Sequence, residues 1–181
     1  MEAPANVNEP LMVEPLLDKV LGEDIEMELF ARAGTNPAYL AENGFDVTAL
    51  DISDRAVELA MEKARQASVI IDFLIGDFTS LPFKEDRFGF VFDFGCFHHV
   101  EPELRTTFVE GVHRALDNGG TYLMVCFSDK NGRATNHFSR EKIVELFWDR
   151  FEIGRMNHIS SVEGDGVTRY FYEVLMNKPE S

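Results

Sequence analysis

Two acidic residues in the sequence stand where an acidic side chain can bind a nucleoside. Asp51 ends a strand-like run, residues 46–51, about 20 residues beyond the loop of an earlier strand-like run. An acidic side chain at the end of the second strand of an open α/β sheet can accept both hydroxyls of a ribose. The alternative is that Asp51 is a carboxylate favoured by the dipole of the following helix. Asp77 follows the next such run, in Gly76-Asp77-Phe78.

A pair of histidines, His98 and His99, follows a third apolar run, residues 88–96. A histidine at the edge of a substrate pocket can act as a general base or orient a nucleophile. The alternative for each is a partly buried structural histidine. The pair is not predicted to bind a metal, because adjacent residues on a strand point to opposite faces. No Cys/His spacing matches a zinc site either, so no metal is expected.

The elements that must position these residues alternate between strand-like and helical patterns, which is typical of βαβ units and a mainly parallel sheet. Ligands bind at the carboxyl ends of the strands in such a sheet. Strands are predicted over residues 23–30, 46–51, 70–76, 88–96 and 121–127. Helices are predicted over residues 9–21 and 36–43. Another begins at Ser53 and carries Val57, Ala60, Met61 and Ala64 at helical spacing. Two more are predicted from Leu104 to Leu116 and after Ser139.

The last part of the chain differs in kind. Residues 151–160 and 167–176 are both strand-like, and only a short acidic glycine turn joins them. Two consecutive strands without a crossover helix pair antiparallel. Five βα-type units followed by an antiparallel hairpin is an unusual order, and it is the most informative coarse feature of the sequence.

Length and charge limit the classes of function. The chain has 181 residues, of which 45% are hydrophobic, so we expect one folded domain over residues 1–181, with residues 1–22 as a lead-in region. Lys and Arg total 17 against 32 Asp and Glu, a formal net charge of −15. Such a surface repels nucleic acid and favours a small-molecule substrate, although acidity also serves solubility alone.

The cysteines and the amino-terminal residues indicate the compartment. Cys96 and Cys126 are too few for a disulfide framework and fit a reducing cytosol. Both stand in apolar runs and are interpreted as ordinary packing residues. Residues 1–10 contain no apolar signal region, and no apolar run approaches the roughly 18 residues that span a bilayer. We therefore expect a cytoplasmic protein without membrane contact.

Three stretches resemble the class I S-adenosylmethionine-dependent methyltransferases, in particular the small bacterial enzymes that act on small molecules. Residues 40–53 (LAENGFDVTALDIS) resemble the stretch after motif I. Residues 76–93 (GDFTSLPFKEDRFGFVFD) resemble the third and fourth strands, and residues 115–125 (ALDNGGTYLMV) the L-x-x-G-G turn before strand five. The terminal hairpin resembles the sixth and seventh strands of the family.

The resemblance implies a Rossmann-like α/β fold: a seven-stranded, mostly parallel sheet in the order 3-2-1-4-5-7-6, with strand seven antiparallel and helices on both faces. It implies S-adenosylmethionine as cofactor, methyl transfer to a small molecule without a metal, and a monomer or weak homodimer.

The same resemblance assigns roles to residues. Asp51 would bind the ribose hydroxyls and Ile52 would pack on the adenine. Asp77 would accept from the adenine amine, beside a backbone donor at Phe78. The end of strand four, residues 93–96 with Phe94 as a contact, would lie near the methionine part and the transferred methyl. The candidate catalytic residues, where the substrate pocket begins, are His98 and His99.

The first loop departs from the family pattern, which reads acidic-x-Gly-x-Gly-x-Gly. Glu28 and Gly34 match this pattern and are the cofactor candidates of the loop, but Phe30 and Arg32 replace the first two glycines. Those glycines provide positive φ angles and let the backbone approach the ligand closely. A side chain with such a φ costs about 1–2 kcal/mol.

Three interpretations of this loop stay open. The loop is rearranged and still binds the cofactor, or the site is lost or crippled, or the loop serves another ligand, with Arg32 meeting an anion. A non-catalytic binding protein on the methyltransferase scaffold is therefore the alternative function. A nicotinamide-dependent oxidoreductase is disfavoured by the terminal hairpin and by the Gly-Asp-Phe after strand three. The adenosine half of the site is expected to be better preserved than the methionine half.

Overall fold

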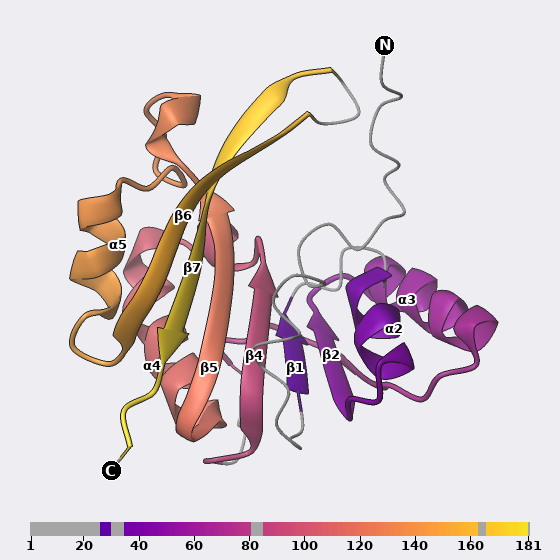
Figure 1. Cartoon of the computed structure of the whole chain (residues 1–181). Helices are drawn as coiled ribbons and strands as arrows, with labels where there is room; N and C mark the ends of the chain where they lie inside the picture. Colours follow the sequence, from indigo (N-terminus) through magenta and orange to yellow (C-terminus); the bar gives the residue numbers. More distant parts are fainter. Residues whose placement is uncertain (1–25, 30–34, 81–84, 163–165, 181) are drawn as a thin grey trace.

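The computed structural model describes residues 26–29, 35–80, 85–162 and 166–180. They form an α/β structure around a seven-stranded sheet in the order β3-β2-β1-β4-β5-β7-β6 (Figure 1), the order implied by the resemblance. The strands are β1 (Glu26–Leu29), β2 (Val47–Asp51), β3 (Asp72–Ile75), β4 (Phe88–Phe94), β5 (Leu116–Phe127), β6 (Glu152–Val162) and β7 (Thr168–Asn177). The predicted lead-in helix over residues 9–21, with Phe30, Arg32 and Gly34, lies outside the described residues.

The pairing of the strands follows from the connections between them. The strands β3, β2, β1, β4 and β5 pair in parallel, because a helix or a long loop connects each with the next along the chain. The predicted hairpin is confirmed, since β7 runs antiparallel to both β5 and β6. The carboxyl ends of β2, β3 and β4 therefore meet at the same edge of the sheet.

Two of the described helices begin at the serine caps predicted from the sequence. The described helices are α2 (Thr35–Glu42), α3 (Asp54–Ala67), α4 (Arg105–Ala115) and α5 (Arg140–Phe147), with short 3-10 turns η2 (Phe97–His99), η3 (Pro102–Leu104) and η4 (Asp129–Asn131). The hydroxyls of Ser53 and Ser139 accept backbone N–H groups at the starts of α3 and α5, as expected of N-cap residues. None of these described helices is long and apolar enough to cross a membrane.

Alternate residues of β5 pack into two separate cores on the two faces of the sheet. Tyr122 and Met124 belong to the core beneath α4 and α5, together with Phe108 and Phe147. Leu123 belongs to the other core, with Leu40 of α2. On this second face Ala60 of α3 packs on Ala49 of β2. The two cores lie on opposite faces of the sheet, so helices lie on both faces, as predicted. In Figure 1, α4 and α5 lie toward the β5, β6 and β7 end of the sheet and α2 and α3 toward the β2 end.

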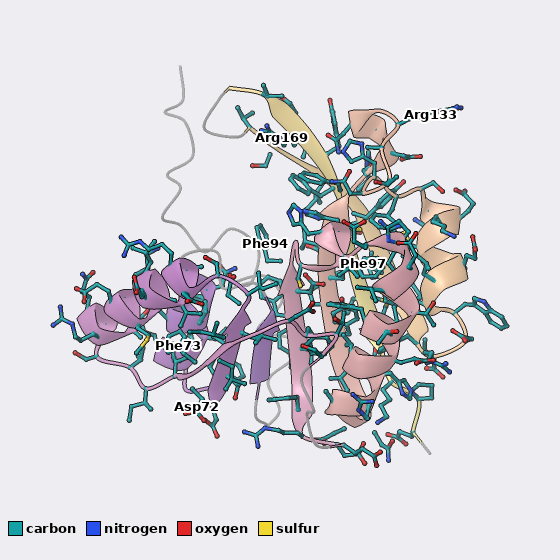
Figure 2. The ribbon with its side chains drawn as sticks, turned by 180° about the vertical axis from the view of Figure 1, so that it is seen from behind. Asp72, Phe73, Phe94, Phe97, Arg133 and Arg169 are labelled. Carbon is teal, nitrogen blue, oxygen red and sulfur yellow. The ribbon has the colours of Figure 1, made fainter. Side chains whose placement is uncertain are left out.

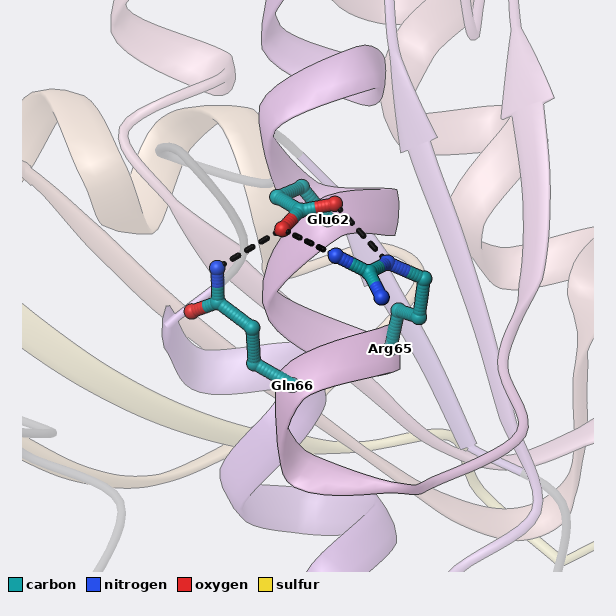
Figure 3. A network of polar contacts seen from close by, with 3 residues as sticks. All are labelled: Glu62, Arg65 and Gln66. Atoms are coloured by element: carbon teal, nitrogen blue, oxygen red, sulfur yellow. Dashed lines mark hydrogen bonds and ion pairs between the residues drawn. The ribbon is translucent and has the colours of Figure 1, made fainter.

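The outer face of α3 is exposed and carries charged side chains. Glu62 accepts hydrogen bonds from Arg65 at 2.6 and 3.0 Å and from Gln66 at 2.8 Å (Figure 3). The hydrogen bonds from Arg65 are the main reason that the pKa of Glu62 is lowered. Exposed pairs of this kind contribute little to the free energy of unfolding, because water and salt screen them.

Several strand boundaries and the burial of one side chain differ from the prediction. The third strand is shorter, Asp72–Ile75, and the fourth ends at Phe94 rather than at residue 96. Met61 of α3 is 54% exposed, although its spacing predicted an inward side chain. The predicted turn at residues 118–120 lies inside β5, which begins at Leu116. Gly120 is required there because a Cβ would lie 2.8 Å from the carbonyl oxygen of Asp117.

Candidate functional site

A cavity of about 240 Å³ opens at the carboxyl ends of β2, β3 and β4. Its walls come from three segments: residues 50–52 at the end of β2, residues 76–79 after β3, and Cys96, residues 99–101 and Leu104 after β4. This is the edge of the sheet where a ligand of an open α/β fold is expected.

Asp51 lies at the end of β2 with its carboxylate held in one orientation. The side chain is almost fully buried but lines the cavity. One oxygen, Oδ1, accepts the backbone N–H of Ser53 at 2.8 Å. The carbonyl of Asp51 accepts the N–H of Gly76 at 3.0 Å, which ties the ends of β2 and β3 together. Among the described residues no hydrogen-bond donor contacts Oδ2.

Asp77 shapes the turn after β3. Its Oδ1 accepts the backbone N–H of Thr79 at 2.9 Å and the Thr79 hydroxyl at 2.8 Å. Its carbonyl accepts the N–H of Ser80 at 2.9 Å. These short-range bonds hold the Asp77 carboxylate in place, and Asp77 and Asp51 line the same cavity. Nearby Ile52 is 66% exposed and adds an apolar side chain to the same wall.

The ring of Phe78 packs in the core on the α4 face of the sheet. The ring is buried, with its centroid 5.0 Å from that of Phe108. It fills the space above Gly111 of α4, where a Cβ would lie 2.9 Å from Phe78 Cε1. Phe78 also lines the cavity, and its backbone role toward a ligand stays a prediction.

Gly111→Ala is expected to lower the free energy of unfolding by about 1–3 kcal/mol, because the new methyl overlaps the Phe78 ring. The better helix propensity of alanine, worth about 1 kcal/mol, offsets only part of this. Urea unfolding measures the difference, with Thr107→Ala on the exposed face of α4 as control. A Gly111→Ala protein as stable as the wild type would contradict the close packing of Phe78 on α4.

Asp93 is fully buried beneath the turn that follows β4. Its carboxylate accepts the N–H of Cys96 at 2.6 Å, the N–H of Phe97 at 3.0 Å and the hydroxyl of Tyr122 at 2.8 Å. Burial raises the pKa of Asp93 to about 7, although these three hydrogen bonds favour the charged form. The sequence analysis included residue 93 only as the first residue of the predicted strand end, residues 93–96. The feature that could have indicated its role is an aspartate inside an apolar run.

The stability of the protein is expected to fall as the pH rises from 5 to 7. The carboxyl of an unfolded aspartate has a pKa near 3.8, whereas that of folded Asp93 is about 7. Between these values the folded state binds a proton that the unfolded state releases, so raising the pH favours unfolding. The loss is on the order of 1.4 kcal/mol per pH unit and ends above pH 7. Urea unfolding across this range should show a flatter dependence in Asp93→Asn; an identical dependence would contradict the raised pKa.

His98 and His99 lie on the 3-10 turn η2, not on a strand, and their ring centroids are 4.4 Å apart. The argument that they point to opposite faces of a strand is therefore wrong. His98 is buried: its Nδ1 accepts the N–H of Phe127 at 3.3 Å, and its ring stacks on Phe127 at 4.1 Å. Burial is the main cause that lowers its pKa to about 3, so it stays neutral. His99 is exposed and lines the cavity.

Of the remaining candidates, Phe94 is not among the described residues that line the cavity. Phe94 belongs to the core on the α2 face, with its ring centroid 6.0 Å from that of Phe92, whereas Phe97 belongs to the opposite core (Figure 2). Glu28 lies in β1, in register with Ala49 of β2 and Phe92 of β4. Gly34 lies outside the described residues.

The cavity thus brings together Asp51, Ile52, Asp77, Phe78 and His99. Sequence reasoning missed three wall residues that follow β4: Val100, Glu101 and Leu104. It included Cys96 in the strand end expected near the methionine part, but interpreted the thiol itself as a packing residue. The position of the three missed residues just after the end of a strand is the feature of the sequence that could have identified them as wall residues. Apart from His99, the titratable acid and base side chains on the wall are acidic. No three His, Cys, Asp or Glu side chains in the described part of the chain are grouped as a metal site.

Comparisons with known proteins identify the family and the fold. A family model described as a methyltransferase domain matches residues 27–120, just over half of the chain. An uncharacterized methyltransferase of Schizosaccharomyces pombe is 25% identical over 122 residues, which are 67% of this chain and 84% of that protein.

Two solved structures share the fold. A SAM-dependent methyltransferase of Methanosarcina mazei has a TM-score of 0.83 at 21% identity, over 92% of this chain and 98% of that one. The 1,6-didemethyltoxoflavin-N1-methyltransferase of Burkholderia thailandensis, with bound 1,6-didemethyltoxoflavin and S-adenosylhomocysteine, has a TM-score of 0.76 at 21% identity, over 92% and 76% of the two chains.

Proposed function

The chain belongs to the methyltransferase domain family, and from this premise we propose that it binds S-adenosylmethionine in the cavity at the ends of β2, β3 and β4 and transfers the methyl group to a small molecule. The observation that carries the proposal is the convergence of Asp51, Ile52 and Asp77 on one cavity. These three positions are the ones that the family resemblance assigns to the adenosine.

The chemistry of the wall fits this cofactor. One oxygen of Asp51 is fixed by Ser53, which leaves the other for the ribose hydroxyls. Ile52 offers an exposed apolar side chain to the adenine, and Asp77 offers an acceptor to the adenine amine. Glu101 adds a further negative charge at the wall. An acidic wall favours a ligand with positively charged sulfonium and amino groups.

When bound, S-adenosylmethionine supplies a methyl group that its positively charged sulfur has already activated. The protein then has to align the acceptor with that methyl group, exclude water and take up the proton of the acceptor. His99 is the described histidine on the cavity wall and is proposed to take up or orient this proton. His98 has its Nδ1 bonded to the backbone and serves to hold Phe127.

The proposed acceptor is a small molecule with a thiol, amine or oxyacid group. The net charge of −15 disfavours nucleic acid. The Burkholderia thailandensis neighbour was crystallised with a small molecule, which supports the same class here. A screen of such acceptors with labelled S-adenosylmethionine tests the assignment, and transfer of label to tRNA or DNA rather than to small molecules would contradict it.

A non-catalytic binding protein is the second candidate, favoured by Phe30 and Arg32 in place of the loop glycines. The two candidates differ in one result. An enzyme transfers the label to an acceptor, whereas a binding protein on the same scaffold takes up the cofactor or its product without any turnover.

His99→Ala is expected to lower kcat about tenfold, below the usual range for a lost general base because the sulfonium is already activated. Its stability should change little, since the side chain is exposed. His98→Ala should instead lower the free energy of unfolding by about 2–4 kcal/mol, because it removes a buried ring stacked on Phe127. Steady-state kinetics and urea unfolding separate the two effects. An unchanged kcat in His99→Ala would remove His99 from the mechanism.

A further inference from the structure

We propose that Asp93 and Tyr122 are positioning residues of the cofactor pocket: together they hold the turn of residues 95–99 and thereby place Cys96 and His99 on the cavity wall. The inference rests on the proposed function and extends it to two side chains that do not line the cavity themselves. Asp93 comes from the end of β4 and Tyr122 from the neighbouring strand β5.

The hydrogen bonds around Asp93 converge on this turn. Cys96 and Phe97 donate their backbone N–H groups to the carboxylate at 2.6 and 3.0 Å. Tyr122 donates its hydroxyl to Oδ2 at 2.8 Å from the opposite side. Both Asp93 and Tyr122 are fully buried. The carboxylate is thus fixed by a separate strand and in turn fixes two consecutive N–H groups of the turn.

The turn leaves little freedom for another arrangement. Gly95 has a φ of 100°, and a Cβ there would approach Cε1 of His98 to 3.1 Å. The ring of Phe97 anchors the turn in the core, with centroids 5.2 Å from Phe138 and 5.1 Å from Phe147. On the cavity side the same five residues carry Cys96 and His99. A shift of the carboxylate therefore moves the wall.

The buried carboxylate of Asp93 needs hydrogen-bond donors when it is charged. A buried carboxylate is unfavourable unless hydrogen bonds satisfy it, and bonds to a charged acceptor are stronger than bonds to a neutral one. The turn should accordingly be held best when Asp93 is ionised. Loss of the Tyr122 hydroxyl removes one hydrogen-bond donor to the Asp93 carboxylate and weakens the hold on Cys96 and Phe97.

Several titratable groups face Asp93. Tyr122 and Cys126 approach from β5 and Cys96 from the turn, and burial raises the pKa of each. Asp51 and Asp77 act on Cys96 from the cavity. His98 stays neutral because burial lowers its pKa to about 3. His99, which is exposed, is the remaining titratable neighbour on the turn. The binding titration described next is therefore repeated in a His99→Gln background.

The test is calorimetric titration of the full chain with S-adenosylhomocysteine from pH 5.5 to 8.5. The wild-type affinity should rise with pH through about 7. Asp93→Asn should remove this pH dependence. Tyr122→Phe should bind about tenfold more weakly at pH 7, the effect of one charge-assisted hydrogen bond, with its midpoint at higher pH. Tyr172→Phe on β7 is the matched control, because its hydroxyl lies by Ser128, and should match the wild type.

A second readout does not need the cofactor. The rate of Cys96 alkylation by iodoacetamide, followed by mass spectrometry, should rise in Tyr122→Phe and Asp93→Asn but not in Tyr172→Phe. If the wild type binds no S-adenosylhomocysteine while these rates still differ, the proposed function fails and the positioning role stands. If the wild type binds, and both variants keep its affinity, pH profile and alkylation rate, the positioning role is overturned.

Discussion

Asp51→Ala is expected to weaken the binding of S-adenosylhomocysteine by at least about a hundredfold. The proposed contacts are hydrogen bonds from both ribose hydroxyls to a carboxylate, and bonds to a charged group contribute about 1.5–3 kcal/mol each. A loss of about 2.8 kcal/mol corresponds to a hundredfold change in the dissociation constant. Calorimetric titration measures it, and adenosine should show the same loss because the contact lies in the adenosine half.

Two variants control this experiment. Asp46→Ala removes an exposed aspartate just before β2, at the opposite end of that strand, and should bind like the wild type. Asp51→Asn keeps an oxygen that can accept the N–H of Ser53, so it separates the loss of charge from a loss of local structure. An affinity unchanged in Asp51→Ala would remove Asp51 from the site.

The double variant Phe30→Gly with Arg32→Gly is expected to bind the cofactor ten- to hundredfold more tightly. Both positions lie outside the described residues, so the expectation rests on the family pattern of the loop. Relief of one strained position recovers on the order of 1 kcal/mol, and clearing ligand volume adds to this. Each 1.4 kcal/mol is about tenfold in affinity.

Stability is expected to move the other way in this variant. Two new glycines enlarge the unfolded ensemble and lower the stability by up to about 1 kcal/mol each. Tighter binding with a flat or slightly lower Tm would support an obstructed loop. Affinity that stays the same or falls would instead indicate that the present loop serves another ligand, with Arg32 as its candidate contact.

Regular patterns in the sequence predicted most of the framework. Serine caps at Ser53 and Ser139 and the hairpin at the end of the chain depend on neighbouring residues, so they could be recognised. The acidic residues at the ends of β2 and β3 could be placed for the same reason, because the carboxyl ends of parallel strands share one edge of the sheet.

The turn after β4 could not be predicted, because its cause lies far along the chain. Residues 88–96 form one apolar run in the sequence. The strand nevertheless ends at Phe94, because the Asp93 carboxylate accepts a hydrogen bond from the backbone N–H of Cys96. The partner that fixes Asp93 is Tyr122, 29 positions away.

The two histidines show the same limit. His98 and His99 are equivalent by position in the sequence, and only the contact with Phe127 buries one and leaves the other on the cavity wall. Met61 has the spacing of its buried neighbours in α3, yet it is 54% exposed. Periodicity predicts which face of a helix turns inward, but it does not predict how far the core extends.

The central claim is that the cavity between Asp51 and Asp77 binds S-adenosylmethionine, and calorimetric titration of the unmodified chain tests it most directly. We predict one saturable site per chain for S-adenosylhomocysteine, with a dissociation constant below about 1 mM, equivalent to about −4.1 kcal/mol. The binding heat should disappear in Asp51→Ala and persist in Asp46→Ala. No saturable binding up to that concentration, or equal binding by both variants, would contradict the account.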